Sequence, residues 1–249
     1  MSGAVGVQQN GSAPVTTTHL LVRYAKRGKM RFASHLDVAR AFERGVRRAG
    51  LPIAYSAGFT PHPKISYAGG APTGVASEAE YLSLALTSRV EADVAREQLN
   101  AALPDGIDVI VVTEDAGGLP ASRLTASEWQ VTLPGLRPGD AAEVVQKFLA
   151  LDEAPVERLT SKGMRRMDAR SAVVSLDVHG GDRHDGHIND GAVGDAMLRM
   201  VLRHTVPSVR PDDVINALRD VSEVIPTALP HITRLTQGSL GESGAVVAL

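Results

Sequence analysis

The sequence feature that most constrains the fold is one amphipathic helix with unusually clear start and stop signals. Ser34 and Asp37 form an S-x-x-D capping box, which satisfies the first free amides of a helix. Gly50 is a natural stop, and Pro52 blocks any continuation. We therefore predict a helix over residues 35–49, packed by its apolar stripe against neighbouring strands.

The order of the remaining segments then predicts the fold class. Around this helix, alternating apolar segments and a second helical segment give the order β-α-β-β-(β)-α-β, and the second half of the chain repeats the pattern. This order predicts an α+β protein of two ferredoxin-like units, each an antiparallel sheet with helices on one face. The predicted parts are a disordered tail at 1–18, a first unit at 19–116, a second unit at 127–237 with a flexible insertion at 179–195, and a flexible tail at 238–249.

Composition narrows the class of protein. The 249 residues are 43% hydrophobic and contain no apolar run near the roughly 18 residues that a membrane helix needs. The N-terminal segment has neither a positive start nor an apolar centre, so we expect a cytoplasmic protein with no membrane contact. The absence of cysteine excludes disulfides, thiolate-held iron–sulfur clusters, cysteine zinc sites and a cysteine nucleophile from this chain.

Positive charge is concentrated in one part of the chain. Residues 19–64 carry ten Lys and Arg against two acids, a local balance of +8 within a chain of net charge −2. Such a basic segment is typical of a surface that binds phosphate or another anion. An ordinary solvated surface explains it equally well.

The predicted helix divides into an apolar and a basic face. Its inward side carries Val38, Phe42, Gly45, Val46 and Ala49, and Gly45 would allow a close backbone approach. Glu43 is placed to pair with Arg47, while like charges repeat at i, i+4 and repel one another weakly. A bound anion that neutralised these arginines would explain why they lie on one side of the helix, and an ordinary solvated face remains the alternative. The arginines on the outward side are Arg40, Arg44, Arg47 and Arg48.

The segment after the helix, residues 55–74, predicts either a binding loop or an ordinary hairpin connection. Gly58, Pro61 and Pro63 make it rigid and articulated, while His62 and Lys64 supply a polarisable donor and a fixed charge. The order of a P-loop is absent.

Two residues of the helix start have a structural explanation beside a functional one. For His35, a hydrogen bond near the helix cap is a better explanation than catalysis. For Asp37, helix capping and stabilisation of the helix dipole are the better explanation. His35, His62 and Lys64 are nevertheless the candidates for acid–base work, if the chain has any.

Five stretches of the sequence carry a resemblance to a known family. RFASHLD, RGVRRAGLP and YSAGFTPHPK resemble the signature of the radical-SAM-linked domain family, and KGMRRMDARSAVVSL and RPDDVINAL resemble its later motifs. The likeness spans most of residues 19–237. The signature residues here would be Ser34, His35, Asp37, Arg44, Arg48, Ser56, Gly58, Pro61, Pro63 and Lys64.

The resemblance implies a partner protein for this chain and does not specify an activity of the chain itself. It implies association with a radical SAM protein that carries a cobalamin-binding region. Because this chain has no cysteine, S-adenosylmethionine, the iron–sulfur cluster and cobalamin would belong to that partner alone.

Two weaker signals remain in the sequence. Residues 179–195 contain three histidines and four aspartates, but their spacing matches no closed metal site, so we predict a flexible insertion and no metal. Four aromatic residues near the basic segment could stack on bases, although the core is their more common place. They are Tyr24, Phe32, Tyr55 and Tyr67.

Three functions follow as hypotheses. The first is a non-catalytic RNA-binding or substrate-presenting subunit working with a radical SAM enzyme. The second is an RNA-processing or transferase enzyme using His35 or His62, and the third is a protein-only adaptor for the radical SAM partner. The predicted binding residues are Ser34, His35, Asp37, Arg40, Arg44, Arg47, Arg48, Ser56, Gly58, Pro61, His62, Pro63 and Lys64.

Overall fold

The computed structural model describes residues 18–115, 121–160, 163–179 and 195–249. The predicted N-terminal tail, apart from Thr18, and residues 180–194 of the predicted insertion lie outside these ranges. The chain divides into two compact units, and each is described by itself below. Among the helices that these ranges contain, none is both long and apolar enough to cross a membrane.

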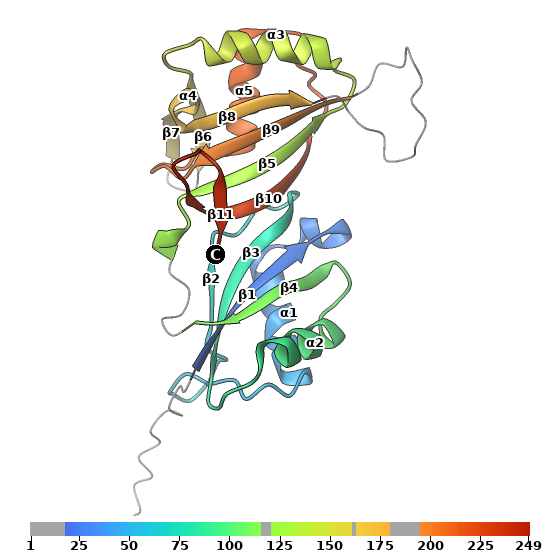
Figure 1. Ribbon diagram of the computed structural model, residues 1–249, viewed down its shortest axis with the longest axis vertical. Coiled ribbons are helices and arrows are strands. Elements are labelled where there is room, and N and C mark those ends of the chain that lie inside the picture. The colour runs from blue at the N-terminus through green and yellow to red at the C-terminus, as the bar shows by residue number, and fades with distance from the viewer. Residues whose placement is uncertain (1–17, 116–120, 161–162, 180–194) are drawn as a thin grey trace, which may run out of the picture. The chain divides into compact units, whose positions relative to one another are not determined.

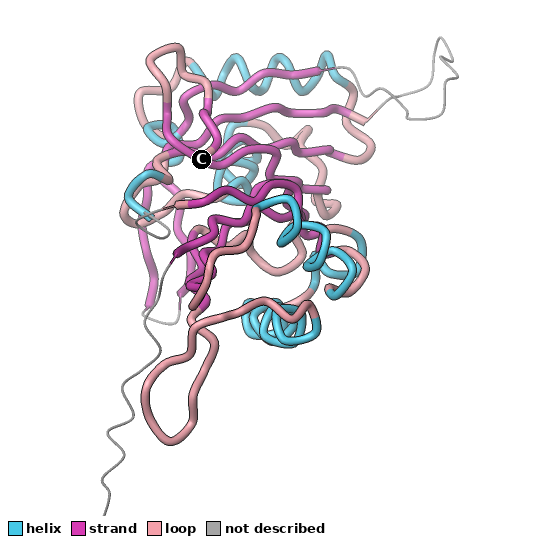
Figure 2. The backbone as a smooth tube through the Cα atoms, turned by 60° about the horizontal axis from the view of Figure 1, so that its bottom comes forward, coloured by secondary structure: helices cyan, strands magenta, loops and turns pink. Residues whose placement is uncertain are grey.

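The first unit follows the predicted β-α-β-β-α-β order (Figure 1). Its strands are arranged in the order β4-β1-β3-β2, and its two helices contact each other (Figures 1 and 2). The elements are β1 (Thr18–Lys26), α1 (His35–Arg48), β2 (Ile65–Ala68), β3 (Ala76–Leu86), α2 (Ala92–Ala102) and β4 (Ile107–Glu114). The short 3-10 helix η1 (Gly28–Phe32) follows β1 along the chain and belongs to the second unit.

The second unit repeats this arrangement with additions. Its four central strands are arranged β10-β5-β9-β8, and a separate two-stranded hairpin, β6–β7, follows its first helix. The elements are η2 (Ala121–Arg123), β5 (Ala126–Leu133), α3 (Pro138–Leu149), β6 (Pro155–Thr160), β7 (Gly163–Asp168), α4 (Ala169–Ala172), β8 (Val173–His179), β9 (Ala196–Arg203), α5 (Pro211–Val221), β10 (His231–Leu240) and β11 (Val246–Ala248).

The two strand orders are the same when each unit is numbered separately. Counting the four main strands of each unit along the chain, both sheets have the order 4-1-3-2, which is the ferredoxin-like arrangement. The predicted fold class, α+β with two ferredoxin-like units, is therefore confirmed.

The boundaries of the units differ from the predicted ones. Residues Ala25–Phe32 and Ala71–Glu80 belong to the second unit, although the sequence assigns them to the first. The reason is strand pairing between residues far apart in the sequence. Thr233 and Arg234 of β10 pair in parallel with the first residues of β3. β3 is consequently divided between the units at Glu80.

The predicted flexible tail at 238–249 is wrong where residues 238–240 and 246–248 form strands. β10 continues to Leu240, and β11 pairs with it antiparallel. Gly238 permits this pairing, because a Cβ there would lie 1.9 Å from the carbonyl oxygen of Val247. Between α1 and β2 the chain forms two isolated bridges, Ile53 with Leu86 and Tyr55 with Pro63.

Each unit has its own apolar core. In the first unit, Leu20, Phe42 and Leu99 are completely buried. In the second unit, Trp129 and Phe148 belong to one large cluster of buried side chains contributed by the sheet and its helices.

The second unit also buries a polar network that the sequence analysis missed. Arg234 is only 3% exposed, and its guanidinium forms an ion pair with Glu80. It also donates to Gln237 Oε1 over 2.7 Å and to Ser77 Oγ over 3.3 Å. A buried charge costs several kcal/mol unless it is paired, so these partners make the position of Arg234 possible.

Lys26 extends the network. Its ammonium donates to the carbonyl oxygens of Ala71 at 3.3 Å and Pro72 at 3.4 Å. Burial lowers the pKa of Lys26, while the negative charge of Glu80 acts in the opposite direction. The lysine thus ties η1 and the segment before β3 into one polar cluster.

Candidate functional site

The start of α1 is formed by the predicted capping box. Asp37 N donates to Ser34 Oγ over 3.2 Å, and Ser34 N donates to Asp37 Oδ2 over 3.2 Å. The hydrogen bonds from Ser34 lower the pKa of Asp37. Both residues are therefore occupied in holding the helix end, which is the structural role expected from the sequence.

The inner face of α1 is fixed by packing. Val38, Ala41, Phe42, Gly45 and Val46 are buried, while Ala49 of the predicted face is half-buried. A Cβ at position 45 would lie 2.8 Å from Leu103 Cδ2, so Gly45 lets the side chain of Leu103 pack closely against the helix. This packing sets which side of the helix faces the solvent.

The outer face of α1 carries three arginines that are exposed to solvent. Arg40, Arg44 and Arg47 make no hydrogen bond or ion pair with any residue that the structure describes, and the expected pair of Glu43 with Arg47 is not formed. Arg48 differs, because its Nη1 donates to the carbonyl oxygen of Ala102 over 3.1 Å. The predicted basic stripe is thus reduced to three free guanidinium groups.

The loop after α1 is closed at its base and open at its tip. Ser56 N donates to the carbonyl oxygen of His62 over 2.9 Å, and His62 N donates to Ser56 Oγ over 3.0 Å. Gly58 has φ +120°, which a side chain would strain. The next residue, Phe59, is fully exposed although it is aromatic. The loop therefore presents an apolar ring beside a rigid turn.

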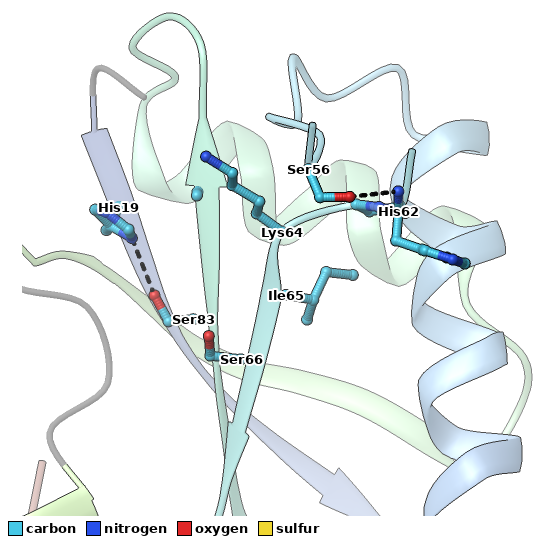
Figure 3. Close-up of a pocket in the computed structure, with 9 residues that line it drawn as sticks. His19, Ser56, His62, Lys64, Ile65, Ser66 and Ser83 are labelled. Carbon is cyan, nitrogen blue, oxygen red and sulfur yellow. Dashed lines mark hydrogen bonds between the residues drawn. The ribbon is translucent and has the colours of Figure 1, made fainter. Parts of the chain in front are cut away.

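A pocket of about 470 Å³ lies beside this loop (Figure 3). The described residues that line it include no Asp or Glu, whereas two imidazoles, one ammonium and three hydroxyls are among them. His19 Nδ1 lies 3.5 Å from Ser83 Oγ. Such a set of donors favours an anionic ligand. The lining residues are His19, Ser56, His62, Pro63, Lys64, Ile65, Ser66, Ser83 and Ala85.

The structure brings only some of the predicted site residues together. Ser56, His62, Pro63 and Lys64 line the pocket, but His35 does not. The structure instead places the His35 ring edge-on to Tyr67, with 5.2 Å between ring centroids. Gly58 and Pro61 lie exposed in the loop. An acid–base pairing of His35 with Lys64 in this pocket is therefore not formed.

Three polar residues of the pocket were missed by sequence reasoning. Ser66 is on β2, two residues after Lys64, and both line the pocket. Ser66 is the register partner of Ser83 on β3. His19 belongs to β1. The strand alternation could have linked Lys64 with Ser66, but His19 and Ser83 depend on pairing between distant strands.

The basic segment 19–64 does not form a single charged surface. Lys26 is buried, Arg27 forms an ion pair with Glu78, and the Arg31 guanidinium lies 4.6 Å from the centroid of the Phe32 ring. The local excess of +8 therefore overstates the charge available to a ligand.

The aromatic candidates divide between core and surface. Tyr24 is buried against Phe42, with ring centroids 4.7 Å apart, and Tyr67 packs on the same ring at 6.4 Å. Burial, followed by the nearby charge of Glu43, raises the pKa of Tyr67. Phe32 is 59% exposed. Of the four predicted residues, Phe32 is the most exposed, and the Arg31 guanidinium lies over its ring.

The histidine- and aspartate-rich stretch cannot be placed, because residues 180–194 lie outside the described ranges. Within the described ranges, no group of three or more His, Asp or Glu side chains is arranged to hold a metal ion.

Comparison with protein families identifies the group to which the chain is related. A family described as "Uncharacterized protein conserved in bacteria (DUF2344)" matches residues 19–211. The chain belongs to this family. The match includes α1, the loop and every residue that lines the pocket.

Other comparisons add little. No curated protein matches the chain. One similar solved structure is titled "Crystal Structure of a Cbf5-Nop10-Gar1 Complex", with 11% identity and a TM-score of 0.46. The match covers 92% of this chain and 52% of the other, so the chain spans about half the length of that relative.

Proposed function

We propose that the chain is a non-catalytic RNA-binding or substrate-presenting subunit that works with a cobalamin-type radical SAM enzyme. The observation that carries the RNA part is the set of three exposed guanidinium groups on α1, which have no partner among the described residues. A protein gains little stability from such a row of like charges, whereas phosphates along a nucleic acid strand would neutralise it.

The loop and the pocket support the same function. Lys64 and His62 offer donors in a pocket whose lining has no carboxylate, and Phe59 is an exposed ring on the same loop. Basic side chains that follow the backbone and aromatic rings that stack on bases are the usual elements of single-strand binding. In this mechanism α1 neutralises phosphates while Phe59 stacks on a base.

The partner part of the proposal is supported by the signature resemblance and by composition. The chain has no cysteine, so a radical SAM cluster would be held by the partner, together with S-adenosylmethionine and cobalamin. The pair would act in the cytoplasm.

The salt dependence of RNA binding tests the proposal. Each lost phosphate contact to a single strand should flatten the plot of log affinity against log salt by roughly 0.7. The variant R40Q/R44Q/R47Q should therefore bind a single-stranded RNA more weakly and reduce the slope by about 2.

A matched control comes from exposed arginines of the second unit. The variant R123Q/R165Q/R166Q removes the same charge and should keep the wild-type slope. An unchanged slope in the α1 variant, or no RNA binding at low salt, would reject the RNA function. If the α1 variant also failed to bind the radical SAM partner, the protein-only adaptor would be favoured. If the isolated chain catalysed a reaction and His62→Ala abolished it, the enzyme would be favoured.

A further inference from the structure

The pocket beside β2 has a different chemistry from the arginine face of α1. The arginines are separate charges on an exposed convex helix, whereas the pocket gathers hydroxyl, imidazole and ammonium groups around one volume of about 470 Å³. Figure 3 shows Lys64 between His19 on one side and the Ser56–His62 pair on the other. Ser66 and Ser83 form the neighbouring wall from paired strands.

We propose that this pocket binds the terminal phosphate monoester of an RNA strand. The inference rests on the proposed RNA-binding function and specifies which part of the strand the pocket receives. Three of the residues involved, His19, Ser66 and Ser83, have no role in the signature resemblance.

The number of donors favours a monoester over a backbone phosphodiester. A phosphodiester has one negative charge and two free oxygens, which one guanidinium on an open surface can satisfy. A phosphate monoester near neutral pH carries close to two negative charges and three strong acceptor oxygens. The ammonium of Lys64 alone has three donors, and each pocket serine has one hydroxyl proton to donate.

The hydroxyl groups are available for this role. Ser56 Oγ accepts the hydrogen bond from His62 N and keeps its own proton for a ligand. Ser66 is exposed, and no described residue hydrogen-bonds to its side chain. Ser83 is only 3% exposed and contacts His19, so it holds the imidazole at the pocket wall.

The position of His62 gives the strand a direction. Figure 3 shows His62 on the side of the pocket nearest α1, opposite His19. A strand whose end lies beside Lys64 would leave the pocket past His62 and continue toward the arginine-bearing helix. The terminal phosphate and the backbone phosphates would then be bound by different residues of one unit.

Three forms of one short RNA test this assignment. The forms carry a 5′-phosphate, a 3′-phosphate or hydroxyls at both ends, and their dissociation constants are measured at the same salt concentration. The wild type should bind one phosphorylated form about tenfold more tightly than the hydroxyl form, because charge-assisted hydrogen bonds to the added group are gained. Which phosphorylated form is preferred tells which end of the strand enters the pocket.

Variants separate this inference from the proposed function. K64Q and H19Q should bring the affinity ratio of phosphorylated to hydroxyl RNA close to one, and H19Q should leave the salt slope of the hydroxyl form unchanged. R40Q/R44Q/R47Q should weaken all three forms and keep the ratio. Equal wild-type affinity for all three ends, with the α1 salt slope intact, would overturn the terminal-phosphate site and leave the RNA function standing. Absence of any RNA binding would overturn both.

Discussion

The two ferredoxin-like units use arginine in opposite ways. In the first unit, Arg40, Arg44 and Arg47 are exposed and have no described partner. In the second unit, Arg234 is 3% exposed and is bound by Glu80, Ser77 and Gln237. Because an unpaired charge is costly only where water is excluded, the buried arginine must be satisfied by the protein, whereas the exposed arginines are free to bind a ligand.

The largest predicted effect removes the partner of the buried arginine. Glu80→Gln leaves the Arg234 guanidinium without its carboxylate and should lower the free energy of unfolding by about 3–5 kcal/mol. Urea denaturation measures this loss. Glu78→Gln is the matched control, because its partner Arg27 is 48% exposed at the side chain and an exposed pair contributes at most about 1 kcal/mol. Equal effects of the two substitutions would contradict the contrast between buried and exposed charge.

The second prediction concerns β11, a strand paired with β10 that has no equivalent in the order of the first unit. Gly238→Ala would place a Cβ against the backbone of Val247, so it should destabilise the protein by about 1–3 kcal/mol through forced displacement of β11. Denaturation gives the magnitude, and proteolysis of the C-terminal segment reports the displacement. Gly241→Ala is the control, because its nearest contact would be at 3.4 Å. Resistance of the Gly238→Ala segment to proteolysis would show that the pairing tolerates a side chain.

The third prediction tests whether the α1 start is structural. Ser34→Ala removes the acceptor of the Asp37 amide and should cost about 1 kcal/mol of stability, whereas Ser34→Thr retains a capping hydroxyl and should cost less. Thermal unfolding distinguishes them. Unchanged stability together with lost RNA binding would make Ser34 a contact residue instead.

The smallest effect is expected for the exposed arginines. Changing Arg40, Arg44 and Arg47 to glutamine should alter the free energy of unfolding by no more than about 0.5 kcal/mol, since they form no hydrogen bond or ion pair with a described residue and their mutual repulsion is weak. Thermal unfolding of this triple variant beside the wild type provides the measurement. A large drop in stability would mean that the α1 face supports the fold.

Local signals explain what could be predicted of the fold. The limits of α1 follow from Ser34, Asp37 and Gly50, which act within one helical turn of the helix ends. The repeated element order could likewise be predicted from alternation and helical periodicity. The alternation of HITRLTQG even places Arg234 on the same face as the buried Ile232. Its partner Glu80 lies 154 positions away, and no local pattern identifies it.

The candidate site shows the same limit. The loop residues His62 and Lys64 were predicted because glycine and proline mark a rigid loop in the sequence. His19 and Ser83 could not be predicted, since the pocket wall depends on which strands become neighbours. Phe59 had a readable signal, an apolar side chain between Gly58 and Pro61, but it is not among the predicted binding residues.

The division of β3 between the units has a consequence for synthesis on the ribosome. Lys26 and Glu80 leave the ribosome well before Arg234, which follows Glu80 by 154 residues. The first unit can therefore fold while translation continues, as N-terminal domains do. The Glu80 carboxylate of β3, however, is neutralised only after β10 has been synthesised, because β10 carries the Arg234 guanidinium. A nascent chain stalled before β10 would retain an incomplete strand edge, which is the kind of surface that chaperones recognise.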